Sequence, residues 1–376
     1  MSQNIYPQPT YEIYLDTPTG LRLALVESFT RLHMVRRRNA IGRFALTLPA
    51  DTVDDTFIRA DALLEIWRTF PSVSSRLWMA GLLRRPEYSD VGGADQLVLS
   101  GEDGNGLLAA RIVAYYADTA QAAKTDQADD MMKAIVRENL GASAVAARDL
   151  TSYGLTVAAD VALGPSITKK FAWKTVLDAL LNIADTAKTA GTEVYFDMVP
   201  QVLSGTQIGW LFQTFINQRG ADRTYASGVP TVFGREWGNL ENPRLVYDYS
   251  EEASYVYVGG QGEGSDREVV ERSDAGRIGL SPWNRRERFV QGSNETSTAA
   301  LQARGDQALE EGMPRVLFSG SIKDTPQTRF GIDWDFGDKV VAVYRDRQFD
   351  AHIDAVTITV DENGLENIDA RIEVVT

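Results

Sequence analysis

The sequence predicts an α+β protein that contains two small β-barrel domains with an inserted α/β region. Three observations lead to this fold class. Short apolar runs of period two fill both ends of the chain, helical spacing marks its middle, and glycine- or proline-rich turns separate the runs. A length of 376 residues also allows two or three domains.

The expected domains follow these changes of pattern. We expect a first β-barrel domain over 1–117, the helical part of the insertion over 118–191 and returning strands over 192–242. A second β-barrel domain covers 243–376, with a helical insertion near 265–312. Bent strands and tight hairpins near the C-terminus favour closed or nearly closed barrels.

The first third of the chain indicates strands. Apolar residues alternate on both sides of the turn-prone segment Thr17–Gly20, which predicts a hairpin. Phe44, Leu46 and Leu48 alternate again and stop at Pro49. Further short strands are expected over 63–67, 77–83 and 96–99, and Gly92 and Gly93 mark a turn before the last of them.

The middle of the chain predicts two helices. Apolar residues recur at helical spacing over 128–140 and again within 169–190, and Gly141 and Gly191 are plausible ends. Ser166 or Thr168 is the expected cap of the second helix. Core packing, rather than a cofactor site, explains both apolar stripes.

The remaining segments return mainly to strand patterns. Strands are expected over 192–199, 208–216 and 245–258, followed by a third helix over 295–311. Near the C-terminus, a turn at 337–338 leads into strand 339–344. The next long strand slips phase at 354–355, which predicts a β-bulge, and 361–364 is a hairpin turn before the last strand.

Composition excludes several classes of function. A net charge of −14 argues against a protein that grips DNA phosphates, and the short basic run Arg36–Arg38 is interpreted as a solvated turn or strand edge. The chain has no cysteine, which excludes thiol nucleophiles and cysteine-based zinc sites. No apolar run is long enough to span a bilayer, and the N-terminus lacks a signal-peptide pattern, so synthesis and folding in the cytoplasm are expected.

No catalytic, cofactor-binding or metal-binding residue is predicted. The glycine run 259–264 lacks the spacing of a nucleotide-binding loop and is interpreted as a loop between strands. His352 shares a strand face with Asp350 and Asp354, where a hydrogen-bonded barrel face or subunit contact is favoured over a metal or acid–base site. The other histidine, His33, carries less information, and the many carboxylates leave a glycosidase pair open.

Several short motifs, in order along the chain, resemble one known family. The first segments are 40–49 (AIGRFALTLP), 79–84 (MAGLLR), 97–103 (LVLSGED) and 107–111 (LLAAR). Later segments are 218–224 (QRGADRT), 236–240 (EWGNL), 255–262 (YVYVGGQG) and 336–340 (FGDKV), the last with Phe in place of the usual Leu. The sequence resembles the baseplate hub, or tail-associated, proteins of long-tailed bacteriophages, most closely the short siphophage type without an enzymatic extension.

The resemblance singles out structural motif residues rather than catalytic ones. These are Gly101, Asp103, Leu108, Arg111, Asp222, Arg223, Gly238, Asn239, Leu240, Gly337 and Asp338.

The family resemblance implies a structural hub of the virion tail, assembled in the host cytoplasm. It implies a homotrimeric ring whose six barrels match the tail tube or distal tail protein above it. The implied partners are that ring, tip, fibre or receptor-binding proteins and, as a further candidate, the tape measure protein. DNA would only pass through the channel, where an acidic lining would repel phosphates, and no membrane insertion is implied.

Two other functions remain as alternatives to the hub. One is a cell-wall hydrolase that uses a carboxylate pair, and the other is a carbohydrate-binding adhesin, given seven tryptophans and fourteen tyrosines. The sequence ends at Thr376, directly after the predicted final hairpin. We therefore expect cell-wall cleavage and receptor binding to reside in other proteins.

Overall fold

The computed structural model describes residues 8–71, 73–114, 122–293, 295 and 297–375. Strands contain 47% of residues and helices 18%, so the chain is mainly β. Contact clustering divides the chain into two compact units. Unit 1 comprises 1–242 and 320–373, and unit 2 comprises 243–319 with the last three residues.

The N-terminal part of unit 1 is a run of strands. They are β1 (Thr10–Asp16), β2 (Arg22–Leu25), β3 (Arg31–Arg37), β4 (Arg43–Pro49), β5 (Leu63–Thr69), β6 (Arg76–Val91) and β7 (Ala94–Asp103). The expected hairpin across Thr17–Gly20 joins β1 to β2, and Gly92 and Gly93 turn β6 into β7. The alternating Phe44, Leu46 and Leu48 form β4 and are all buried.

The C-terminal strands of the chain join the same sheet. They are β13 (Asp222–Arg223), β14 (Val232–Gly234), β15 (Leu240–Asp248), β19 (Arg315–Lys323), β20 (Lys339–Tyr344), β21 (Arg347–Asp361) and β22 (Glu366–Val375). The expected bulge near 354–355 is present as a register shift between Ile353 and Ala355. The turn at 361–364 joins β21 to β22, as expected.

One 14-stranded sheet therefore contains both strand-rich ends of the chain. Its order is β15-β19-β22-β21-β3-β4-β7-β6-β5-β1-β2, and β20 pairs with β21 while also holding β13 and β14. Antiparallel pairing of β3 with β21 joins the N-terminal strands to the C-terminal ones.

Two separate small barrels are not confirmed. Within the described residues the large sheet stays open, with β2 and β15 at its two ends. Alternation defines which face of a strand is buried but not which distant strand pairs with it. The sequence pattern therefore identified most strands without revealing the β3–β21 pairing.

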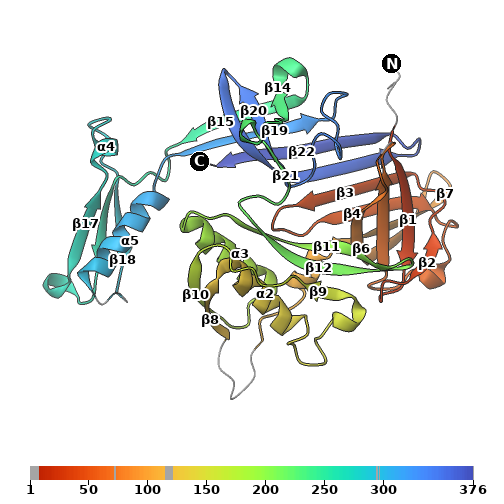
Figure 1. Ribbon diagram of the computed structural model, residues 1–376, viewed down its shortest axis with the longest axis horizontal. Helices are drawn as coiled ribbons and strands as arrows, with labels where there is room; N and C mark the ends of the chain where they lie inside the picture. Colours follow the sequence, from red (N-terminus) through yellow and green to blue (C-terminus); the bar gives the residue numbers. More distant parts are fainter. Residues whose placement is uncertain (1–7, 72, 115–121, 294, 296, 376) are drawn as a thin grey trace. The chain divides into compact units, whose positions relative to one another are not determined.

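The segment between these strand groups forms a mixed region (Figure 1). It contains α1 (Asn105–Ala109), β8 (Ala122–Gln127), α2 (Ala128–Asn139), η2 (Thr151–Tyr153), β9 (Leu155–Val157), β10 (Ser166–Phe171), α3 (Val176–Thr189), β11 (Val194–Ser204) and β12 (Gln207–Ile216). Strands β8 and β10 form one antiparallel pair, and β11, β12 and β9 form a three-stranded sheet. Helices α2 and α3 contact each other, α2 contacts β12 and α3 contacts β11, which builds one apolar core.

The prediction for the second helix was partly wrong. Residues 169–171 lie in β10, and the helix begins only at Val176. Its cap is Thr175, whose hydroxyl accepts a hydrogen bond from the Asp178 amide, rather than Ser166 or Thr168. The strand pairing of β10 with β8 overrides the helical spacing there. The helices predicted over 128–140 and 295–311 are confirmed as α2 and α5 (Thr298–Glu311).

Unit 2 is a small sheet with a helix. Strands β16 (Tyr255–Gly259), β17 (Val269–Ser273) and β18 (Glu287–Gln291) pair in the order β17-β16-β18, and α4 (Ala275–Ile278) lies between the last two in sequence. Helix α5 contacts β16 and β17. The glycine run 259–264 starts at the end of β16 and continues into the connection to β17. It is therefore mainly a loop between strands, as expected.

Candidate functional site

Two of the motif pairs singled out in the sequence lie together in the structure. Asp222 and Arg223 form β13, which pairs in parallel with the start of β20 just after Gly337 and Asp338. The Arg223 Nε atom donates to Asp338 Oδ2 at 2.6 Å, and the Ala221 amide donates to Asp338 Oδ1 at 2.7 Å. Asp338 therefore fastens two segments that are more than 100 residues apart in sequence.

The turn before β20 explains its glycine. Gly337 has a φ of +84°, a conformation that side chains other than glycine rarely adopt. Its carbonyl accepts the Gly220 amide at 2.8 Å, so the backbone itself also joins the two segments. Burial raises the pKa of Asp338, while its hydrogen bonds from Arg223 and two backbone amides oppose that effect.

A third motif closes the loop before β15. The buried Asn239 side chain accepts from the Gly234 amide at 2.8 Å and donates to the Val232 carbonyl at 2.9 Å. Gly238 ends the short helix η4 (Arg235–Trp237), and Leu240 is buried as the first residue of β15. This motif thus has a structural role, since it ties the turn before β15 to the backbone of β14.

The remaining motif residues lie where β7 passes into α1. Gly101 permits a close approach, since a Cβ atom there would lie 1.9 Å from the Leu82 carbonyl oxygen. Asp103 ends β7 and accepts from the Asn105 amide at 3.1 Å, and Leu108 is fully buried in α1. Burial, together with the nearby Asp197 carboxylate, raises the pKa of Asp103 to about 7.

A buried ionic cluster lies beside Asp103. Asp197 of β11 accepts from Arg36 Nη2 of β3 at 2.7 Å and from Arg219 Nη2 at 2.6 Å. Asn105 of α1 donates to the other Asp197 oxygen at 3.2 Å. Burial alone would raise the pKa of Asp197, but the two guanidinium groups lower it overall.

The cluster joins three parts of unit 1. Both guanidinium groups also lie over the Phe336 ring, each 4.8 Å from its centroid, and Arg219 Nη1 donates to the Phe336 carbonyl at 3.4 Å. The cluster therefore ties the N-terminal strands, the mixed region and the turn before β20 together. It has the character of a structural junction, because its charges are paired and its groups are buried.

Sequence reasoning missed this cluster. Arg36 was expected on a solvated turn or strand edge, and that interpretation is wrong because Arg36 is 6% exposed. The available signal was position: Arg36 continues the alternation of the buried Leu32 and Met34 on β3. An inward-facing arginine needs a buried carboxylate, but the sequence contains 52 acidic residues and does not identify Asp197.

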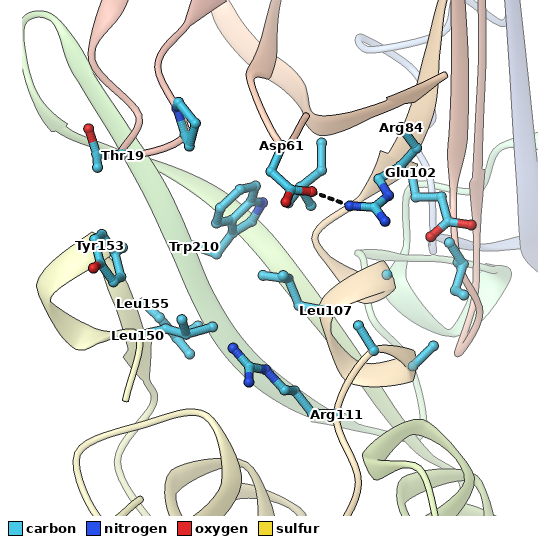
Figure 2. A pocket seen from close by; sticks show the side chains of 16 residues that line it. Thr19, Asp61, Arg84, Glu102, Leu107, Arg111, Leu150, Tyr153, Leu155 and Trp210 are labelled. Carbon is cyan, nitrogen blue, oxygen red and sulfur yellow. Dashed lines mark hydrogen bonds and ion pairs between the residues drawn. The ribbon is translucent and has the colours of Figure 1, made fainter. Parts of the chain in front are cut away.

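A pocket of about 730 Å³ is lined in part by α1 (Figure 2). Its apolar lining comes from the N-terminal strands and from the mixed region, which includes α1. Apolar lining residues are Leu82, Leu107, Leu150, Leu155 and Trp210. Figure 2 shows the guanidinium of Arg111 extending toward Leu150 and Leu155.

Polar groups are few in this pocket. Asp61 and Arg84 form an ion pair in its lining, and Glu102 lines it as well. Trp210 is 6% exposed, and its Nε1 atom has no hydrogen-bond partner among the described residues. The motif residue Arg111 thus shares a mainly apolar cavity, whereas the neighbouring motif residues Asp103 and Leu108 are buried behind it.

The two histidines do not form a catalytic or metal centre in the described structure. His352 Nε2 lies 3.6 Å from Glu193, and burial lowers the pKa of His352 to about 4, so its ring is neutral at pH 7. His33 Nδ1 is hydrogen-bonded with the Thr359 hydroxyl at 3.1 Å. Among residues with described positions, no group of three His, Asp or Glu could hold a metal ion. The helices in the described segments are too short or too polar to cross a membrane.

Comparison with known structures finds the same fold in tail proteins. A tail protein from Neisseria meningitidis MC58 is 15% identical with a TM-score of 0.55, and the match covers 97% of this chain and 96% of that one. The 43 kDa tail protein of prophage MuSo2 from Shewanella oneidensis is 12% identical with a TM-score of 0.56, covering 96% and 97%. A chain of the lidded Francisella PdpA–VgrG complex is 9% identical with a TM-score of 0.52, covering 99% of this chain and 53% of that one.

The family comparison agrees with this fold over nearly the whole chain. No curated protein matches the sequence. The model of one family, described as Siphovirus ReqiPepy6 Gp37-like protein, matches residues 10–372. The chain belongs to the Siphovirus ReqiPepy6 Gp37-like protein family.

Proposed function

We propose that this chain is the hub of a siphovirus tail tip, forming a homotrimeric ring that closes or extends the distal end of the tail tube. The observation that carries the proposal is the family match over residues 10–372, combined with a fold shared along the full length of two tail proteins. In this proposal the large sheet forms the wall of the ring, and the mixed region faces away from the tube and anchors tip or fibre proteins.

The open sheet supports an assembled rather than an isolated role. Its end strands β2 and β15 have one sheet partner each among the described strands. Proteins usually cover or blunt such edges, because unpaired backbone groups promote pairing with other chains. A repeated contact between different edges closes into a ring when the rotation permits it. If each of three subunits contributes two barrel-like halves, the ring would match the six-fold symmetry of the tail tube next to it.

The acidic charge of the chain would suit a channel through which DNA passes. Each chain carries −14, and a ring of acidic surfaces would repel DNA phosphates during passage. The charge explanation fails if the lumen of an imaged ring proves neutral or basic. The proposed neighbours are the distal tail protein or tail tube ring above, and tip or receptor-binding proteins outside.

The mass of the purified protein in solution tests the trimer. One chain is 41.5 kDa, so light scattering after size-exclusion chromatography should give about 125 kDa, and averaged electron micrographs should show three-fold rings. A protein that stays monomeric at every concentration, and also in the presence of the tail tube ring, would overturn the proposal. A monomer that clears a peptidoglycan suspension would instead favour a hydrolase.

A further inference from the structure

The pocket behind α1 continues into an unusual strand edge. Leu21, Leu23 and Leu25 are 45%, 39% and 48% exposed, at alternate positions in and just before β2. Strand β2 ends the order of the large sheet. Its start is already paired with the tip of the β11–β12 hairpin, where Leu21 bridges to Gln207 and the Arg22 amide donates to the Thr206 carbonyl at 3.0 Å. The part of β2 from Leu23 to Leu25 has no second strand partner among the described strands. Three exposed leucines on one side of an edge strand form a surface that soluble proteins normally avoid.

Contacts connect this edge with the pocket. The turn that precedes β2 contributes Pro18 and Thr19 to the pocket lining, and the Ile208 amide donates to the Gly20 carbonyl at 3.0 Å. The tip of the β11–β12 hairpin adds exposed Val202 and Leu203, and a Cβ atom placed on Gly154 would lie 2.5 Å from Leu203 Cδ1. Gly154 follows Tyr153, which is itself part of the lining.

The charges of the pocket select one kind of occupant. Arg84 pairs with Asp61, and the second carboxylate of the lining, Glu102, is drawn on the Arg84 side of the pocket in Figure 2. No described carboxylate pairs with Arg111. The Arg111 guanidinium extends beside apolar Leu150 and Leu155 (Figure 2), where its field is less screened than in open water. An apolar group that fills the cavity next to a carboxylate would satisfy both features. A cavity of about 730 Å³ accommodates a large aromatic side chain with part of its backbone.

We propose that this pocket binds an extended segment of a different tail protein, inserting a bulky apolar side chain that is followed by an acidic residue. Alternate apolar side chains of the same segment would lie beside Leu23 and Leu25 of β2, in the manner of strand addition to a sheet edge. The inference rests on the proposed function of the chain as an attachment point for other tail proteins, and it names the surface and the chemistry of attachment.

A synthetic peptide tests the proposed recognition. The probe is fluorescein-labelled Thr-Leu-Thr-Leu-Thr-Phe-Asp with an amidated C-terminus, and binding is followed by fluorescence polarisation with the full chain. One control peptide replaces Asp by Asn, which removes the charge, and a second replaces Phe by Ala, which removes the anchor. We expect the Asp peptide to bind about tenfold more tightly than the Asn peptide, since bonds to charged groups contribute most.

Protein variants locate the binding. Ala110 is exposed in the pocket lining, so Ala110→Phe should fill the cavity and weaken both phenylalanine peptides at least about tenfold without unfolding the chain. Arg111→Gln should abolish the difference between the Asp and Asn peptides, which makes a double-mutant cycle. The matched control is Arg235→Gln, an exposed arginine outside the pocket, which should change neither affinity.

Three results would overturn the inference. The first is absence of binding at 1 mM peptide, taken as roughly the weakest useful affinity. The second is an Asp-to-Asn ratio unchanged in Arg111→Gln. The third is a loss of oligomer mass in Ala110→Phe without peptide, which would mean that a neighbouring copy occupies the pocket. Because oligomer mass is measured separately, a trimer that ignores the peptide contradicts only this inference and leaves the proposed ring intact.

Discussion

Buried charged side chains define the structure at the scale of single residues. Lys133 of α2 is 1% exposed between Asp129 and Asp130, at 2.9 and 3.4 Å. Both carboxylates also accept backbone amides of the segment 161–163, which fastens that loop to the helix. Such groups add little net stability when paired, but they tolerate few alternative arrangements.

Asp197 should be among the residues least tolerant of substitution. Asp197→Ala would leave Arg36 and Arg219 buried without their common carboxylate, at an expected cost of about 3–5 kcal/mol in the free energy of unfolding. Urea denaturation followed by circular dichroism measures this cost. The control is Asp185→Ala on the exposed side of α3, which should change stability by less than about 0.5 kcal/mol. Equal stability of the two variants would contradict the junction role.

Asp16 should make stability depend on pH. This carboxyl group of β1 is fully buried, and burial together with the Glu65 carboxylate raises its pKa to about 8. The folded protein therefore holds a proton that the unfolded chain releases near pH 4. The Asp16 contribution to stability is complete below about pH 4 and is lost as the pH rises toward about 8.

Replacing Asp16 by Asn removes this titration while keeping the shape of the side chain. Asp16→Asn should be about 1–3 kcal/mol more stable than the original protein at pH 8, with little difference at pH 4. Urea titrations at both pH values test this, with Asp95→Asn, an exposed strand residue, as control. A difference of the same size at both pH values would show that the Asp16 proton is not responsible.

At the scale of elements, the sequence predicted local structure better than it predicted strand pairing. The alternation of β4, the helical spacing of α2 and the bulge in β21 could all be read from the sequence, since each depends on neighbouring residues. The pairing of β3 with β21 could not be predicted, because alternation along a strand does not indicate which distant strand pairs with it. For the same reason, a pocket assembled from α1, β9 and β12 had no sequence signal beyond Arg111.

The sequence also did not reveal which motif residues lie together in the fold. Short motifs marked Arg223 and Asp338 separately, and only the fold shows that they form one ion pair. The order of the motifs indicated the family, whereas their separate positions suggested no common site.

The link between β13 and β20 should depend unequally on its two partners. Asp338→Ala removes the acceptor of Arg223 and of two backbone amides, Ala221 and Asp335, and should cost about 2–4 kcal/mol. Arg223→Ala should cost less, because Arg223 is partly exposed and Asp338 keeps both amide donors. Thermal unfolding of both variants checks the order, and a larger loss for Arg223→Ala would contradict this account.

At the scale of the whole molecule, the two units differ in how much core they bury. The mixed region of unit 1 alone contains a large apolar cluster built on α2, α3, β11 and β12. Unit 2 has a cluster of five buried apolar residues, namely Ala253, Val256, Val258, Leu301 and Ala308. Two of the five are alanines, so the apolar area removed from water there is small.

Unit 2 should therefore open at lower denaturant concentration than unit 1. We expect amides of β16 to β18 to exchange with deuterium at urea concentrations that leave β3, β4 and β21 protected, because local stability follows the buried apolar contacts. Leu301→Ala removes the largest aliphatic chain of this small core and should cost about 2–5 kcal/mol, lowering only the unit 2 transition. The matched variant Leu46→Ala in β4 should shift the unit 1 transition instead. A single transition, shifted alike by both variants, would mean that the chain unfolds as one cooperative body.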